Sequence, residues 1–211
     1  ITDVGVSLMI LALEGGICSG KTTLAKELSK HSFLMVPEYM DFITKEEQLE
    51  LDYLQESKQS VLPLLLNIEK RRQKEFLDKS VNLVLDRSYL TLLAFEYAKN
   101  NDDCYNLLKN KGLLKEVINP DIIIFLDIDT QTRKDRCYDR GDFDMPSFYL
   151  DEKFNQKNKE FFQEKIDYNV VFFNTLNINP QKMANMISRI NNTRNISLDN
   201  FILQLKNVKK Y

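Results

Sequence analysis

The sequence predicts a three-layer α/β fold, in which a five-stranded parallel sheet carries helices on both faces. Five short apolar runs are continuous rather than alternating, as expected for strands that are buried on both faces. Stretches with helical spacing separate these runs, and strand alternating with helix is typical of a parallel sheet between two helical layers. The predicted strands are 8–13, 33–36, 81–85, 122–126 and 170–173.

Apolar residues three and four positions apart predict the helices. The first follows the first strand at 22–30, and the chain closes with an amphipathic helix at about 197–208. Basic residues near that last helix are expected to form a solvated face. The remaining predicted helices are 64–78, 89–99, 104–117, 130–140, 147–166 and 181–190.

Size and composition fit one globular domain. The chain has 211 residues, of which 43% are hydrophobic and 28% are charged, as in ordinary globular domains. We therefore expect 1–211 to form a single domain. The formal net charge of −2 gives no reason to expect a nucleic-acid partner.

The sequence indicates neither a disulfide-rich or zinc-binding protein nor a membrane or secreted protein. Cys18, Cys104 and Cys137 are odd in number and widely spaced, so neither a disulfide framework nor a zinc site is expected. No apolar run reaches the roughly 20 residues that cross a bilayer. The apolar start, 1–13, lacks the basic front and the cleavage site of a signal peptide. We expect a cytoplasmic protein without a membrane partner.

A glycine-rich loop follows the first predicted strand. Its sequence GGICSGKT fits the pattern G-x-x-x-x-G-K-[ST] at every fixed position, between a buried strand and a helix. In such a loop N–H groups point at phosphates, the lysine (Lys21) reaches the β- and γ-phosphates, and the hydroxyl of Thr22 ligates Mg²⁺. We therefore expect a P-loop NTPase fold that binds ATP and Mg²⁺, rather than a turn with a chance lysine. The nucleotide-binding candidates are Gly15, Gly16, Ile17, Cys18, Ser19, Gly20, Lys21, Thr22 and Thr23.

Polar residues also follow the second and third predicted strands. Asp86, Arg87 and Ser88 come directly after a buried strand, and Glu38 follows the strand before it. Open α/β sheets bind ligands at the carboxyl ends of their strands. There Asp86 can hold Mg²⁺ or its water shell, Arg87 can clamp a phosphoryl group, and Glu38 can face the acceptor. The alternatives are a structural ion pair that caps the next helix and, for Glu38, a surface carboxylate.

Three arginines share one face of the helix at 130–140. Arg133, Arg136 and Arg140 are spaced i, i+3 and i+7. Phosphoryl transfer needs positive charge around the moving group, which this face can provide. In the alternative interpretation, Asp135 and Asp139 pair with these arginines on a solvated helix.

Five segments carry a family resemblance. They read LEG at 13–15, LLL and RRQ between 64 and 73, LDRS with T, A and F between 85 and 95, PDIIIFLDID at 120–129, and RKDRCYDRGD at 133–142. In this order and with this spacing, they are similar to motifs of the thymidylate kinase and deoxynucleoside kinase group of P-loop kinases. The resemblance covers most of residues 9–175.

The resemblance implies further roles. A mobile lid lies at about 133–148, and its Arg136 and Arg140 act on the transferring phosphoryl group together with Lys21 and Arg87, because the glycine-rich loop contains no arginine. In nucleoside kinases of the group, the glutamate that corresponds to Glu38 is the base. A homodimer through the second and third long helices is also implied. The residues implied at the acceptor site are Glu38, Tyr39, Phe42, Arg71, Gln73, Arg87, Thr91 and Phe95.

The chain also departs from the group. The order Pro37-Glu38 reverses the usual Glu-Pro pair, and no arginine precedes Glu38. Glu96 stands in place of a glutamine, and Met145 in place of a lid arginine. The missing arginine before Glu38 favours a nucleoside acceptor, whereas the helix that contains Arg71 favours a monophosphate.

These observations predict an ATP-dependent kinase of a nucleoside monophosphate, similar to thymidylate. The alternatives are a deoxynucleoside kinase acting on a 5′-hydroxyl and a kinase of another small hydroxyl-bearing metabolite. A non-kinase P-loop NTPase is the remaining candidate. A GTPase is not expected, because Asp127-Ile128-Asp129 stands where an N-K-x-D motif would follow the strand. An AAA-type motor would need a larger chain.

Overall fold

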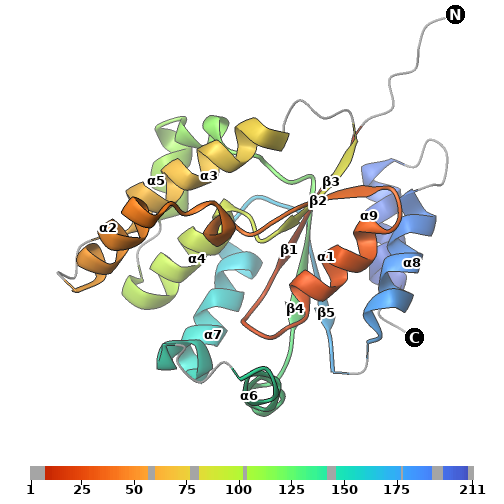
Figure 1. Cartoon of the computed structure of the whole chain (residues 1–211). Coiled ribbons are helices and arrows are strands. Elements are labelled where there is room, and N and C mark those ends of the chain that lie inside the picture. Colours follow the sequence, from red (N-terminus) through yellow and green to blue (C-terminus); the bar gives the residue numbers. More distant parts are fainter. Residues whose placement is uncertain are drawn as a thin grey trace, which may run out of the picture.

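The computed structural model contains the predicted parallel sheet. It describes residues 8–56, 60–76, 81–101, 104–141, 146–176, 178–191 and 197–208. Five parallel strands form the sheet in the order β2-β3-β1-β4-β5, confirming the predicted fold class. Each predicted apolar run corresponds to one strand (Figure 1). The strands are β1 (Ile10–Glu14), β2 (Phe33–Val36), β3 (Asn82–Asp86), β4 (Ile122–Asp127) and β5 (Val170–Asn174).

The strand register brings the carboxyl ends of the strands to one edge. In the central strand β1, Leu13 is paired with Asp86 of β3 and with Ile124 of β4. On the outer side of β3, Leu85 is paired with Val36 at the end of β2. Because all strands are parallel, the residues that follow β1, β2 and β3 meet at this edge.

Helices α1 (Lys21–Ser29), α8 (Pro180–Asn191) and α9 (Leu198–Val208) cover one face of the sheet (Figure 1). Their apolar side chains pack with Leu11 and Leu13 of β1 into one hydrophobic core. The C-terminal helix is part of this core, since Phe201 is fully buried.

A second core lies on the opposite face, where Ala12 points. Five α-helices lie on this side of the sheet (Figure 1), and two short helices, η2 (Leu113–Glu116) and the π-helical η4 (Phe161–Lys165), contribute to its core. Helix α6 (Thr130–Asp139) instead lies at the edge where the strands end. The five are α2 (Lys45–Glu56), α3 (Leu62–Phe76), α4 (Tyr89–Asn100), α5 (Cys104–Asn110) and α7 (Glu152–Glu160).

The helical segments differ from the prediction in three stretches of the chain, 39–56, 104–117 and 147–166. Helix α2 and the 3-10 turn η1 (Tyr39–Phe42) were not predicted. The stretch 104–117 divides into α5 and η2 around Gly112, which has a φ of 71°. The stretch 147–166 begins with η3 (Ser147–Leu150), and Asp151 then caps α7 by accepting a hydrogen bond from the Phe154 N–H.

Among the described helices, none combines the length and the apolar character needed to span a bilayer.

Truncation of Phe201 tests the contribution of α9 to the core. We expect Phe201→Ala to lower the free energy of unfolding by about 3–5 kcal/mol, because it leaves a cavity in a fully buried site. Leu203 lies on the same helix and is 56% exposed, so Leu203→Ala should change the free energy of unfolding by less than about 0.5 kcal/mol. Urea unfolding measures both. Equal effects of the two substitutions would contradict the packing of α9.

Candidate active site

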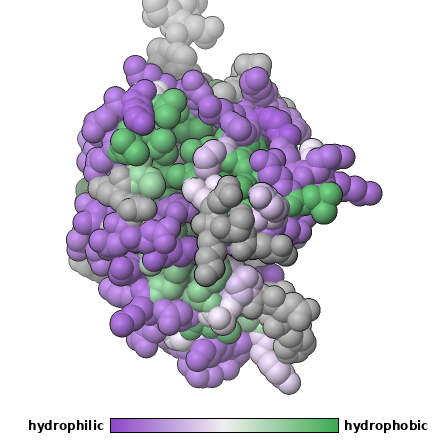
Figure 2. Space-filling view, turned by 90° about the vertical axis from the view of Figure 1, so that its left-hand side faces the viewer, coloured by the Kyte–Doolittle hydropathy of each residue, from purple (hydrophilic) through white to green (hydrophobic). Residues whose placement is uncertain are grey.

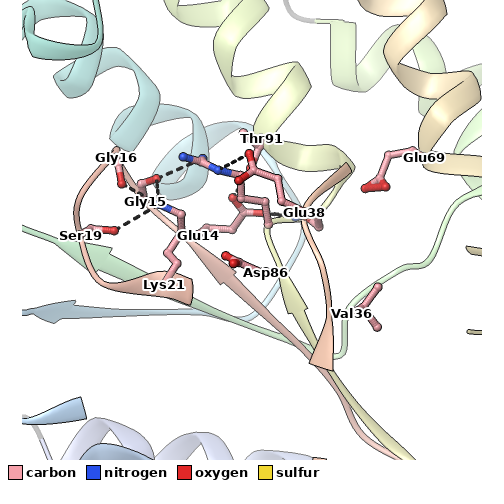
Figure 3. Close-up of polar contacts among 12 residues, drawn as sticks. Glu14, Gly15, Gly16, Ser19, Lys21, Val36, Glu38, Glu69, Asp86 and Thr91 are labelled. Carbon is pink, nitrogen blue, oxygen red and sulfur yellow. Dashed lines mark hydrogen bonds and ion pairs between the residues drawn. The ribbon is translucent and has the colours of Figure 1, made fainter. Parts of the chain in front are cut away.

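The glycine-rich loop joins β1 to α1 at the centre of the sheet edge. Gly15 has a φ of 124°, and a Cβ atom there would lie 2.2 Å from the carbonyl oxygen of Leu126 in β4. Only glycine therefore lets the loop pass so close to the neighbouring strand. The Nζ atom of Lys21 donates to the carbonyls of Gly15 (3.1 Å) and Gly16 (2.6 Å), so this side chain folds back over the loop (Figure 3).

The electrostatic state of Lys21 depends on its burial. The side chain is buried, and desolvation, followed by the nearby cation of Arg87, lowers its pKa to about 7. The carboxylates of Asp86 and Glu38 act in the opposite direction. An anion bound in the loop would also favour the charged form. Lys21 is thus ready to gain a proton when phosphate binds.

Glu38 and Arg87 form an ion pair beside the loop. The Nε atom of Arg87 lies 2.9 Å from Oε1 of Glu38. The Arg87 side chain is buried, adopts a φ of 64° at the end of β3, and lies 5.8 Å from the Phe95 ring. Glu38 keeps about a third of its side chain exposed, at 31%. The structure therefore brings these three predicted site residues together, with the carboxylate accessible.

Asp86 has the surroundings of a metal-site residue. It is buried at 2% exposure, and its Oδ1 atom has no hydrogen-bond partner among the described residues. Thr22, at the start of α1, is exposed and faces the loop cavity. Oxygen ligands from one or two side chains, completed by waters and phosphates, suit Mg²⁺. The two residues thus fit the predicted ion. Among the described residues, no group of three or more His, Cys, Asp or Glu forms a separate metal cluster.

Glu14 connects β1 to the start of α4. Its buried carboxylate accepts hydrogen bonds from the Ser88 N–H (2.8 Å), the Ser88 hydroxyl (2.6 Å) and the Thr91 hydroxyl (2.5 Å). Burial raises its pKa, while these bonds act in the opposite direction. Thr91 is 1% exposed, so the structure places it beneath the site and not at the acceptor surface.

The arginines of α3 are arranged differently from the prediction. Arg71 pairs with Glu47 (2.7 Å), donates to the Phe42 carbonyl and is 45% exposed, so it lies away from the loop cavity. Arg72 is buried instead and binds both carboxylate oxygens of Glu69, at 2.7 and 2.9 Å. Its Nη2 atom also donates to the carbonyls that end β2 and β3, the nearest at 2.7 Å on Arg87.

Arg72 was missed because three basic residues are consecutive in the sequence. The spacing of Leu65, Ile68 and Arg72 on one buried face would have identified it. The side chain of Gln73, predicted to face the acceptor, lies outside the described part of the chain. Tyr39 is buried in the core below the site.

The arginines of α6 face the glycine-rich loop. Arg136 donates to the carbonyls of Cys18 (3.4 Å) and Thr175 (3.1 Å). Arg133 is buried behind the loop, where a Cβ on Gly16 would lie 2.9 Å from its guanidinium. Arg140 lines the cavities described next. Residues 142–145 of the predicted lid, including Met145, lie outside the described residues.

Two cavities flank the loop. One, of about 340 Å³, lies between Cys18, Arg136 and the apolar side chains of Leu24 and Met183. The other, of about 230 Å³, is lined by charged side chains, among them Lys21, Glu38 and Arg87. Together they offer an apolar compartment beside a phosphate cradle and a carboxylate. The charged cavity is lined by Ile17, Cys18, Gly20, Lys21, Thr22, Thr23, Glu38, Arg87, Arg140 and Tyr149.

Tyr149 was not predicted. It follows the lid on η3, and burial raises the pKa of its phenol. Phe95, a predicted acceptor residue, makes an edge contact with its ring. The position of Tyr149, an aromatic residue directly after the predicted lid, was the one sequence feature that could have indicated its place at the site. Phe42 packs at the edge of Phe76 on α3 and does not line either cavity.

A family model described as an AAA domain (AAA_28) matches residues 11–145, which is more than half of the chain. The chain belongs to this family. The match spans the glycine-rich loop, the ends of β2 and β3, and α6. The expectation that this AAA domain is not a motor remains a prediction.

Solved structures share the fold of this AAA domain. Deoxyadenosine kinase from M. mycoides with bound dATP superposes with a TM-score of 0.66 at 20% identity, covering 86% of this chain and 98% of that one. The same enzyme with bound dCTP gives a TM-score of 0.61 at 21% identity, covering 86% and 97%. These likenesses confirm the P-loop fold and the predicted structural relationship. No curated protein matches the chain.

Proton uptake tests the state of Lys21 in this AAA domain. With a pKa of about 7, Lys21 is mostly neutral at pH 8.5, and bound phosphates should recharge it. We expect ATP binding at pH 8.5 to take up close to one proton. Affinity should therefore fall with rising pH above 7, by up to about tenfold per unit.

Calorimetry of ATP binding in buffers of different ionisation enthalpy measures this uptake. Lys21→Arg is the control, because arginine stays protonated and should bind ATP without taking up a proton. Absence of uptake in the unaltered protein would show that Lys21 is already charged in the empty loop.

Proposed function

We propose that the chain is an ATP-dependent kinase that transfers the γ-phosphoryl group to the 5′-hydroxyl of a deoxynucleoside. The observation that carries this proposal is the Glu38–Arg87 pair, a partly exposed carboxylate next to the phosphate loop. A hydroxyl acceptor needs such a base, because it must lose its proton as it attacks. The likeness to structures described as deoxyadenosine kinase supports the same class of acceptor.

The arrangement of cations favours this acceptor over a nucleoside monophosphate. A monophosphate would need positive charge at the acceptor site to offset repulsion between two phosphates. Arg71, the expected cation, instead pairs with Glu47 outside the cavity. Arg72 is engaged by Glu69 and by backbone carbonyls. We therefore give up the thymidylate-like prediction as the main interpretation and adopt its alternative.

Each side chain has a role in the proposed reaction. The apolar cavity accepts the adenine of ATP, and the loop with Lys21 holds its phosphates. Thr22 and Asp86 would hold Mg²⁺, which would supply positive charge beside the phosphates. Glu38 takes the proton of the acceptor hydroxyl while the oxygen of that hydroxyl attacks the γ-phosphorus. ADP leaves with the bridging oxygen.

Arginines surround the group that moves. Arg87 reaches from the end of β3 toward the carboxylate and the loop, with Nη1 3.4 Å from the Gly15 carbonyl. Arg140, which directly follows α6, lines the same charged cavity. Both are placed to balance charge that develops on the equatorial oxygens during transfer. Arg136 holds the loop backbone and borders the adenine compartment.

We also propose that two copies associate through the face made by α3 and α5. Figure 2 shows apolar side chains gathered on the upper part of this face. Leu107 and Leu113 are exposed by 53% and 40%, and a cavity of about 200 Å³ lies between Leu66, Leu108 and Leu113. Such a patch on a single chain is typical of an interface.

The cytoplasmic location remains a prediction.

Replacing the proposed base separates the two acceptor classes. We expect Glu38→Gln to lower kcat on a deoxynucleoside by about 100-fold to 10,000-fold, with little change in the KM for that substrate. Arg71→Ala is the control and should leave this activity unchanged, since Arg71 lies outside the cavity. Steady-state kinetics with deoxynucleosides and their monophosphates measure both. Phosphorylation of monophosphates alone, with Arg71 required and Glu38 dispensable, would reverse the assignment.

Asp86→Asn tests the metal site. We expect a higher Mg²⁺ concentration for half-maximal activity, while ATP affinity without Mg²⁺ changes little, because the carboxylate acts through the ion. Asp127→Asn provides a matched control: this carboxylate also ends a strand, but it pairs with Lys159. An unchanged Mg²⁺ requirement in Asp86→Asn would leave Asp86 with a structural role only.

A further inference from the structure

Two cysteines that are distant in the sequence meet beside the glycine-rich loop. Cys18 lies in the loop and Cys137 in α6, 119 positions later. Their sulfur atoms are 2.6 Å apart, both side chains are buried, and no disulfide joins them. Cys104, the third cysteine, lies on α5.

We propose that Cys18 and Cys137 form a site of oxidative modification, at which a hydroperoxide converts the two thiols into a disulfide between the loop and α6. One thiolate attacks a peroxide oxygen, which gives a sulfenic acid and, from hydrogen peroxide, water. The second thiol then displaces the sulfenic oxygen as water. In total two thiols lose two electrons and two protons, and one hydrogen peroxide becomes two waters.

The surroundings of the pair assign each cysteine a step. Cys18 lines both cavities next to the loop, so a small peroxide can reach its sulfur when no nucleotide is bound. Cys137 lines neither cavity and lies behind Cys18, where it can resolve the sulfenic acid. A disulfide bond is about 2.05 Å long, so little movement is needed.

The disulfide would change how the site binds ATP. Cys18 has a φ of 58° in the middle of the loop, and its carbonyl already accepts a hydrogen bond from Arg136. A covalent bond to the next residue of α6 would fix the loop against the helix. The loop could then adjust less to the phosphates. By linkage, ATP that disfavours the disulfide also protects the thiols from oxidation.

Peptide mass spectrometry and nucleotide binding test this site without any assay of phosphoryl transfer. The reduced protein is treated with hydrogen peroxide, with and without saturating ATP, and is then alkylated and digested. We expect a Cys18–Cys137 cross-link that ATP suppresses, together with a loss of ATP affinity of about tenfold that dithiothreitol reverses. The experiment measures ATP binding and not phosphoryl transfer. The disulfide site can therefore be disproved while the proposed kinase function stands, and the kinase function can be disproved while the disulfide site stands.

Substitutions at the other two cysteines are the controls. Cys137→Ser, with Cys137→Ala as a second variant, should bind ATP like the reduced protein and keep its affinity after peroxide treatment. Cys104→Ser should respond like the unaltered protein. The proposal is overturned if no Cys18–Cys137 cross-link forms, if the cross-link leaves ATP affinity unchanged, or if peroxide weakens binding equally in the Cys137 variants.

Discussion

The guanidinium of Arg72 joins three segments of the site that packing alone would hold less firmly. It binds Glu69 within α3 and donates to the carbonyls at the ends of β2 and β3, including that of Arg87. Arg87 has a left-handed backbone conformation that is unfavourable for a residue with a side chain. Hydrogen bonds to its carbonyl help to hold that conformation, and the conformation directs Arg87 toward Glu38. A buried network thus fixes a partly exposed carboxylate, which is the arrangement that a base requires.

Most cations around the phosphate loop already have partners inside the protein. Lys21 donates to loop carbonyls, Arg87 pairs with Glu38, and Arg136 donates to two carbonyls. Binding of ATP, which we propose for this chain, would therefore exchange internal contacts for contacts with phosphate oxygens. The internal contacts hold these side chains near their working positions and so lower the entropy lost on binding. The same exchange explains why the charge of Lys21 responds to the presence of a phosphate.

Continuous patterns in the sequence predicted the fold well, and single side-chain directions less well. The five apolar runs and the GGICSGKT loop predicted the sheet and its fold class, because burial on two faces and a glycine-rich loop between strand and helix leave few alternatives. The choice between Arg71 and Arg72 depends on the phase of one helix, which the buried positions Leu65 and Ile68 indicate. The contact between Cys18 and Cys137 depends on tertiary packing across 119 positions, which no local pattern indicates.

The position of β1 at the centre of the sheet also determines when the loop can acquire its shape during folding. Its hydrogen-bonded neighbours, β3 and β4, begin more than 70 and 110 positions later in the chain, and Gly15 packs against Leu126 of β4. The loop conformation therefore rests on contacts of high sequence separation, which form slowly because long segments must first be closed. A nascent chain would not present an ordered phosphate site until β4 had left the ribosome. Nucleotide can thus stabilise only chains that have completed most of the sheet, so its binding discriminates finished molecules from partial ones.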